Sequence, residues 1–226
     1  MHSQVRRILL AVALTAVTLQ CAAAGAEPAR VLFVLPRVEY MYLPHWLIGD
    51  ELFPVVDELE EHGVIIDFTS PRAAVYPIPV DEAELHIREV TVEVTSDLVD
   101  LSLYALVVIA GGHAHQYLTV LLEPNLSLLQ EAYELGVTLA GLSQGAMALN
   151  DSGLLAGRTI ARCPQAIGIV YCHNTIPAME RAGTTISDSE CLVVSDGVGD
   201  EPTVITATYD CKLAFARALL EELGLL

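Results

Sequence analysis

Short apolar runs separated by amphipathic stretches make up this 226-residue chain from residue 30 onward. The clearest run is 104–110 (YALVVIA), which ends at a pair of glycines, and 137–142 (VTLAGL) leads directly into Ser143. Strands that alternate with helices predict a mostly parallel sheet with helices on both faces. We therefore expect a single doubly wound α/β domain.

The pattern also predicts where the elements lie. We expect strands at 30–35, 64–70, 104–110, 137–142, 159–162, 191–195 and 204–208, and helices at 44–62, 118–135, 144–150 and 212–223. Prolines 71, 77 and 79 predict an irregular connection after the second strand, and 89–95 alternates as an edge hairpin does.

The first 26 residues have the pattern of a signal peptide. Arg6 and Arg7 precede an uncharged run, 8–19, that is too short to span a bilayer, and small residues follow at 22–26. We expect cleavage after Ala24 or Ala26 and a mature domain of residues 27–226. The mature protein is then periplasmic or extracellular, with no membrane span.

The charge of the chain excludes some partners. The formal net charge is -18, from 29 acidic and 11 basic residues, and Lys212 is the only lysine. Cleavage removes two arginines and no acid, which brings the net charge to about -20. Such a surface repels phosphates, so we expect no nucleic-acid partner. A small-molecule ligand and a second copy in a homodimer are the partners left open.

Four cysteines remain after cleavage, and an even number in an oxidising compartment permits two disulfides. Three pairings exist. We prefer Cys191–Cys211, because these residues flank the expected hairpin of 191–195 with 204–208; Cys163–Cys172 is the second choice.

Residues 141–145 (GLSQG) match the G-x-S-x-G pattern of a nucleophile elbow. A sharp turn between strand and helix lifts the hydroxyl of Ser143 out of the sheet, and the helix N-terminus favours negative charge there. The backbone N–H groups of Gln144 and Gly112 would then serve as oxyanion donors. The same pattern also fits a tight joint with a structural serine.

An ordinary α/β-hydrolase is excluded by the order of residues, because its triad runs serine, acid, histidine. Here only His173 follows Ser143, with Asp151 as the sole acid between them. The candidate bases for Ser143 are His113 and His115, on the loop after the 104–110 strand, and His173.

Two further segments are expected at the carboxyl edge of the sheet, where such folds bind ligands. Gly111 and Gly112 allow close backbone approach after one strand, and Glu39 follows the first strand with a carboxyl that would orient Ser143 or share a proton with it. No carboxylate or cysteine is spaced with His113 and His115 as in zinc sites, so we expect no metal and no cofactor.

The segments VLFVLPRVEY, YALVVIAGGHAH and LAGLSQGAMALNDSGLLAGRTIA resemble the ThiJ/PfpI family, also called the Parkinsonism-associated-protein deglycase family. It belongs to the class I glutamine amidotransferase-like superfamily. The resemblance spans about residues 30 to 224 and implies a flavodoxin-like fold. That family usually has cysteine at the elbow, often followed by histidine, where this chain has Ser143 and Gln144.

A serine hydroxyl needs a base to act as a nucleophile, so the thiol-based activities of the family are not expected here. We favour a binding or protective domain with altered or lost thiol catalysis. The alternatives are a serine-based hydrolase of small amides or esters, similar to the peptidase E branch, and a chaperone-like envelope stress factor.

Overall fold

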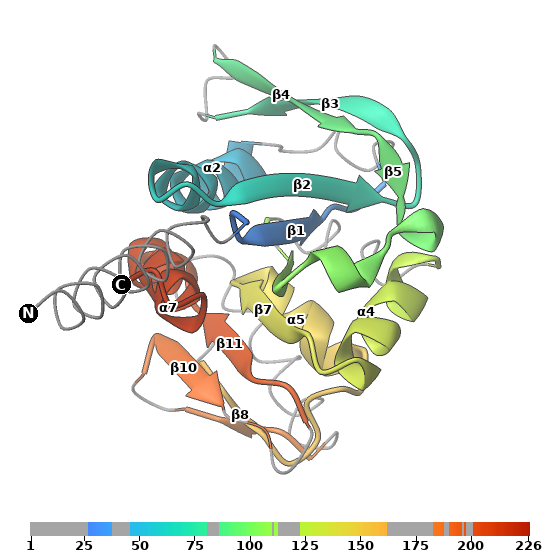
Figure 1. The fold of residues 1–226 in the computed structure, drawn as a ribbon. Helices are drawn as coiled ribbons and strands as arrows, with labels where there is room; N and C mark the ends of the chain where they lie inside the picture. The colour runs from blue at the N-terminus through green and yellow to red at the C-terminus, as the bar shows by residue number, and fades with distance from the viewer. Residues whose placement is uncertain are drawn as a thin grey trace, which may run out of the picture.

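The computed structural model describes residues 27–37, 46–80, 86–109, 111–112, 123–161, 183–187, 190–195, 197 and 201–226. Its centre is a seven-stranded sheet in which every pairing is parallel except that of the edge strand β10 (Figure 1). In spatial order the strands are β10 (Leu192–Ser195), β11 (Val204–Ala207), β7 (Thr138–Leu142), β6 (Leu106–Ile109), β1 (Arg30–Val34), β2 (Ile65–Ser70) and β5 (Val94–Thr95).

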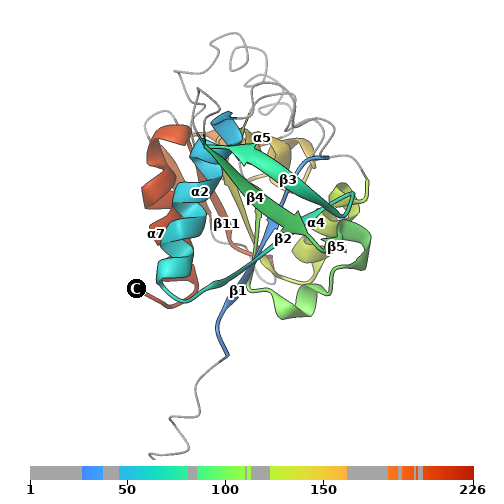
Figure 2. The same cartoon turned by 90° about the horizontal axis from the view of Figure 1, so that it is seen from above.

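Helices cover both faces of this sheet (Figure 2). The helices α2 (Trp46–Glu61) and α7 (Lys212–Glu222) lie on one face, and α4 (Asn125–Glu134) and α5 (Gln144–Asp151) lie on the other. The central strands β6 and β7 are buried along their whole length, as expected when both faces are covered. The predicted doubly wound, flavodoxin-like architecture is confirmed.

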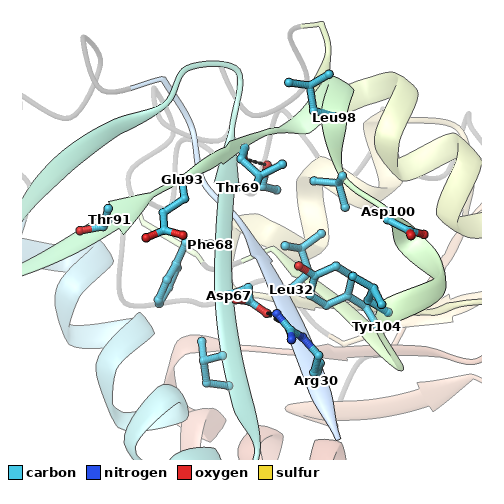
Figure 3. A pocket seen from close by; sticks show the side chains of 14 residues that line it. Arg30, Leu32, Asp67, Phe68, Thr69, Thr91, Glu93, Leu98, Asp100 and Tyr104 are labelled. Carbon is cyan, nitrogen blue, oxygen red and sulfur yellow. Dashed lines mark hydrogen bonds and ion pairs between the residues drawn. The ribbon is translucent and has the colours of Figure 1, made fainter.

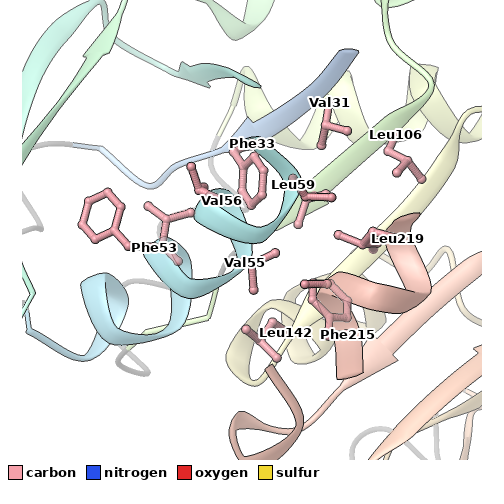
Figure 4. Close-up of a cluster of buried hydrophobic side chains, with 14 of the residues drawn as sticks. Val31, Phe33, Phe53, Val55, Val56, Leu59, Leu106, Leu142, Phe215 and Leu219 are labelled. Carbon is pink, nitrogen blue, oxygen red and sulfur yellow. The ribbon is translucent and has the colours of Figure 1, made fainter. Parts of the chain in front are cut away.

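Two apolar layers hold the helices to the sheet. Figure 4 shows part of the first, in which Phe33 of β1, Val55 and Leu59 of α2, and Phe215 and Leu219 of α7 pack together. The second joins β1, β6 and β7 to α4 and α5 through residues such as Leu32, Val107, Leu129, Met147 and Leu149. Successive residues of β1 alternate between the two layers, because side chains of a strand point to opposite faces.

The helix α2 begins and ends near its predicted limits, but it contains Pro54. A proline has no N–H, so the carbonyl of Asp50, four residues earlier, loses its helical donor. The helix continues because Ile48, Leu52, Val55, Val56 and Leu59 form a buried apolar stripe. Tertiary packing thus outweighs the local preference of proline.

The prediction of an irregular connection at Pro71, Pro77 and Pro79 was wrong in part. Residues Ala74–Pro79 form β3, which pairs antiparallel with β4 (Ile87–Val92) in a separate two-stranded sheet. Pro77 and Pro79 are tolerated because no third strand of the described residues pairs with this ladder, and a strand residue at an open edge needs no N–H. A third pair joins β8 (Thr159–Ile160) to β9 (Thr185–Ile186).

The preferred disulfide is confirmed. Cys191 and Cys211 are bonded, with their Cα atoms 6.0 Å apart. The bond ties the start of β10 to the short 3-10 helix η4 (Tyr209–Cys211) that precedes α7. Cys163 and Cys172 lie outside the described residues, as does the expected signal peptide. Within the described part of the chain, no helix has the length and apolar character of a membrane span.

Candidate functional site

Ser143 stands at a strained turn between β7 and α5. Its φ of 54° and ψ of -115° make it the one non-glycine residue with positive φ in the described part of the chain. Such a conformation costs roughly 1–3 kcal/mol and persists only where surrounding structure enforces it. The N–H of Ser143 donates to the carbonyl of Ala207 over 2.7 Å, which fastens the turn to the end of β11. The predicted elbow geometry is therefore present.

Gly141 explains why the elbow can be this tight. A Cβ at this position would lie 2.7 Å from the backbone nitrogen of Ala146 and 2.7 Å from the carbonyl carbon of Gly145. Any side chain would push α5 away from the end of β7. The first glycine of the GLSQG segment thus lets the helix start directly beneath the serine.

The carboxyl group beside Ser143 belongs to Glu51, which the sequence interpretation missed. Glu51 comes from α2 and is fully buried. Its Oε2 accepts a hydrogen bond of 2.9 Å from the N–H of Gly112, which follows β6. Helix α2 and the segments after β6 and β7 therefore meet at the carboxyl edge of the sheet, the place where ligands bind in such folds.

Burial raises the pKa of the Glu51 carboxyl to about 8, and Asp50 adds a smaller rise. The hydrogen bonds from Gly112 and from the Ser143 side chain, together with the positive charge of Lys212, oppose this rise. The carboxyl is therefore mainly protonated at neutral pH. Its Oε1 is buried and makes no hydrogen bond to any described residue.

Gly111 packs directly against the Glu51 carboxyl, which leaves no space for a side chain at this position. A Cβ on Gly111 would lie 1.4 Å from Oε2 of Glu51 and 2.9 Å from the carbonyl oxygen of Leu142. The absence of a side chain makes room for the carboxyl. The pair Gly111-Gly112, expected to face an oxyanion, thus receives the Glu51 carboxyl instead, with the Gly112 N–H already engaged.

Ser143 and Gln144 are buried, with 3% and 6% of their surfaces exposed, and both lie at the start of α5 as predicted. The N–H of Gln144 belongs to the first turn, where helical N–H groups lack intrahelical partners. Its role as an oxyanion donor stays a prediction. Glu39, His113, His115 and His173 lie outside the described residues, so their proposed roles stay predictions.

One signal would have identified Glu51. It is the single acidic residue within the apolar stripe of α2, one turn after Ile48 and one turn before Val55. Acidic residues are almost never fully buried without partners, so an acid on the apolar face of a helix indicates a special role.

A polar cluster lies next to Glu51. The hydroxyl of Tyr209 donates to Oδ2 of Asp50 over 2.5 Å, and Nζ of Lys212 donates to the same oxygen over 2.8 Å. Nζ of Lys212 also donates to the backbone carbonyl of Asp50 over 3.1 Å. The hydrogen bond to Asp50, followed by burial, raises the pKa of Tyr209 to about 12.

A separate hollow of about 470 Å³ lies beside β2 and is lined by neither Ser143 nor Glu51 (Figure 3). Arg30, the one cationic residue among those that line it, is paired with Asp67. Arg30 donates to Asp67 over 2.7 Å and lies 5.7 Å from the ring centre of Tyr104, and Asp100 accepts a bond from Ser102. This hollow offers no evident nucleophile.

No group of three or more potential metal-ligating side chains occurs within the described ranges. What the arrangement offers chemically is a strained serine, a neutral carboxylic acid and the N-terminus of α5. When Glu51 is protonated, its O–H can donate to the Ser143 hydroxyl, which leaves the Ser143 O–H and the first-turn N–H groups of α5 as donors for a carbonyl or carboxylate oxygen.

The model of the DJ-1/PfpI family matches residues 49–222 of the chain. This range contains the elbow, Glu51 and the polar cluster. No curated protein matches.

Solved structures similar to this chain have the same fold at low sequence identity. A ThiJ/PfpI domain protein from Brachyspira murdochii is 17% identical, with a TM-score of 0.65, and covers 89% of this chain and 99% of its own. A DJ-1 superfamily protein from Agrobacterium tumefaciens is 20% identical, with a TM-score of 0.63, and covers 88% and 91%.

A two-domain protein from Anabaena variabilis, with DJ-1/ThiJ/PfpI-like and ferritin-like domains, is 23% identical with a TM-score of 0.59. The match covers 87% of this chain and 48% of that protein.

Proposed function

Because this chain belongs to the DJ-1/PfpI family but carries serine at its elbow, we propose that it is an exported small-molecule-binding domain without thiol catalysis. The observation that carries the proposal is the pairing of Ser143 with a mainly neutral Glu51. A neutral carboxylic acid does not take a proton from a serine hydroxyl, so the pair binds better than it reacts.

The ligand class follows from the donors at the site. Ser143, protonated Glu51 and the N-terminus of α5 favour a small molecule with a carbonyl or carboxylate oxygen. Short 2-oxo acids and their amides have this chemistry. The buried setting strengthens each hydrogen bond, because the local dielectric is low.

The binding test is calorimetric. A panel of short 2-oxo acids, their amides and simple carboxylic acids is added, and binding raises the unfolding temperature with ligand concentration. We expect Ser143→Ala and Glu51→Ala to lose this rise. Ser127→Ala, a change at an exposed serine on α4, serves as the matched control and keeps it. A rise that survives loss of both Ser143 and Glu51 places the ligand elsewhere.

A serine hydrolase is the second candidate, and the pKa of Glu51 near 8 is the observation that favours it. Above that pH Glu51 is a carboxylate beside the hydroxyl and becomes a base for it. This reading predicts that a fluorophosphonate probe labels Ser143 faster as pH rises through about 8. Glu51→Gln then abolishes the labelling.

The binding proposal predicts weak or no labelling of Ser143 at pH 6 and 7, where Glu51 is mainly protonated and cannot act as its base. It also predicts no elbow-dependent consumption of methylglyoxal, since a serine forms no acidified thiolate. Rapid stoichiometric labelling, or methylglyoxal turnover that Ser143→Ala abolishes, contradicts the proposal.

A further inference from the structure

The backbone carbonyl of Asp50 in α2 lacks its usual helical hydrogen-bond donor. In a regular helix it would accept a bond from the N–H of residue 54, but residue 54 is proline. Nζ of Lys212 fills this place from α7, at 3.1 Å from the carbonyl oxygen. Lys212 is the only lysine of the chain, so no other lysine can take this place.

The same ammonium group also reaches the side chain of Asp50. It lies 2.8 Å from Oδ2, which additionally accepts the hydroxyl of Tyr209, and it lies 4.7 Å from the centre of the Tyr209 ring. Lys212 is partly buried, with 24% of its side chain exposed. A partly buried pair with several bonds is screened less than a surface ion pair.

The disulfide anchors the residues that make these contacts. Tyr209 and Cys211 belong to η4, and Lys212 is the next residue. Cys211 is bonded to Cys191 at the start of β10, so the segment 209–212 is fixed to the edge of the sheet. It then reaches across to the turn of α2 that carries Glu51.

We propose that Tyr209 and Lys212, held by the Cys191–Cys211 disulfide, are positioning residues that fix the proline-interrupted turn of α2 and so keep Glu51 against Gly112 and Ser143. We call this group, Asp50, Tyr209 and Lys212 with the disulfide, the α2 clamp.

Reduction of this disulfide by a dithiol transfers two electrons and two protons to the sulfur atoms, which yields two thiols and one oxidised dithiol. It releases η4 and loosens the clamp.

The electrostatics at Glu51 agree with this role. Of the described residues, Gly112 and Ser143 hydrogen-bond the carboxyl, Asp50 from its own helix disfavours its charge, and Lys212 from α7 favours it. Tyr209 from η4 also senses the charge of Glu51. Removing Lys212 deletes the favourable charge and leaves the Asp50 carboxylate without its ion pair, although the hydroxyl of Tyr209 still donates to it. The loss of the nearby positive charge raises the pKa of Glu51.

The first experiment measures the titration of Glu51 by NMR with ¹³C-labelled glutamate side chains, with Glu51→Gln identifying the signal. We expect Lys212→Met to move the midpoint upward by roughly half a pH unit or more. Arg217→Met, at an exposed cation on the same helix, is the matched control and leaves it in place. A midpoint for Lys212→Met that stays or falls overturns the electrostatic link.

The second experiment measures amide hydrogen exchange of the intact protein with and without a dithiol. We expect reduction to speed exchange at 48–56 and 209–212, while β6 and β7 remain protected. The Cys191→Ser/Cys211→Ser double variant should show the faster exchange without the dithiol and no further response to it. Unchanged exchange at 48–56 after reduction overturns the redox link.

The inference rests on the candidate site but not on its ligand. Both readouts report on Glu51 and α2 in the free protein, so they remain valid if no small molecule binds. Loss of ligand binding with an intact clamp would refute only the proposed function.

Discussion

Among the described side chains, the Glu51 carboxyl has the largest influence on the chemistry of the candidate site. It lies fully buried on the apolar face of α2, and two hydrogen bonds offset only part of its desolvation. Natural proteins keep such a group where it serves a purpose, because an apolar residue would cost less. The chemistry of the site therefore depends on which protonation state it holds.

Stability should fall as pH rises between about 4.5 and about 8, because the folded state keeps a proton on Glu51 that the unfolded chain releases. Each unit of pKa difference corresponds to about 1.4 kcal/mol. Glu51→Gln mimics the protonated form, so its stability relative to wild type should improve with pH, by a few kcal/mol at pH 9. Urea unfolding at pH 5, 7 and 9 checks this, and a difference independent of pH contradicts it.

Gly111→Ala should destabilise the protein by about 1–3 kcal/mol or more, because the new Cβ overlaps the Glu51 carboxyl. In a Glu51→Ala background the same change should cost less, since the overlapping atoms are gone. Denaturant unfolding of the four proteins in this cycle gives the coupling. Equal costs in the two backgrounds would show that Glu51 does not occupy this space.

Among the elements, α2 shows how packing overrides local preference. Its sequence contains Pro54, yet it continues because one face is buried and Lys212 supplies the missing donor. The β3–β4 hairpin shows the converse, since its prolines lie on a strand with a free edge. In α2 the residue that compensates for the proline, Lys212, lies far away in the sequence. In β3 no compensation is needed, because the prolines lie at the edge of the ladder.

The disulfide between η4 and β10 closes a loop of 20 residues. Replacing both cysteines by serine should lower the free energy of unfolding by about 3 kcal/mol, chiefly because the unfolded chain gains freedom. Guanidinium unfolding of the double variant and of the dithiol-treated wild type measures this. A loss below about 0.5 kcal/mol in both would indicate that the bridge constrains neither state.

For the whole molecule, residues 1–26 are proposed to direct export, and 27–226 to form the mature domain. We expect the protein isolated from its native envelope to begin at Gly25 or Glu27, since both follow small residues that fit the cleavage rule. N-terminal sequencing checks this. A protein that retains Met1 in the cytoplasm would contradict the proposal.

Most of the fold was predictable from sequence, because local periodicity and glycine positions report directly on strands, helices and turns. Each strand of the central sheet except β5 was expected near its observed limits, and the elbow at Ser143 followed from five adjacent residues. The Cys191–Cys211 bond was predictable because both cysteines flank a hairpin that the sequence already indicated.

The carboxyl partner of Ser143 was not predictable in this way. Glu39 was the expected group because it closely follows a strand, whereas Glu51 lies within a helix, 92 positions before the serine. A pattern within one segment cannot report which side chain a distant helix turns toward a loop. The choice of Glu51, its raised pKa and its link to Lys212 all depend on how α2 and α7 pack on the sheet.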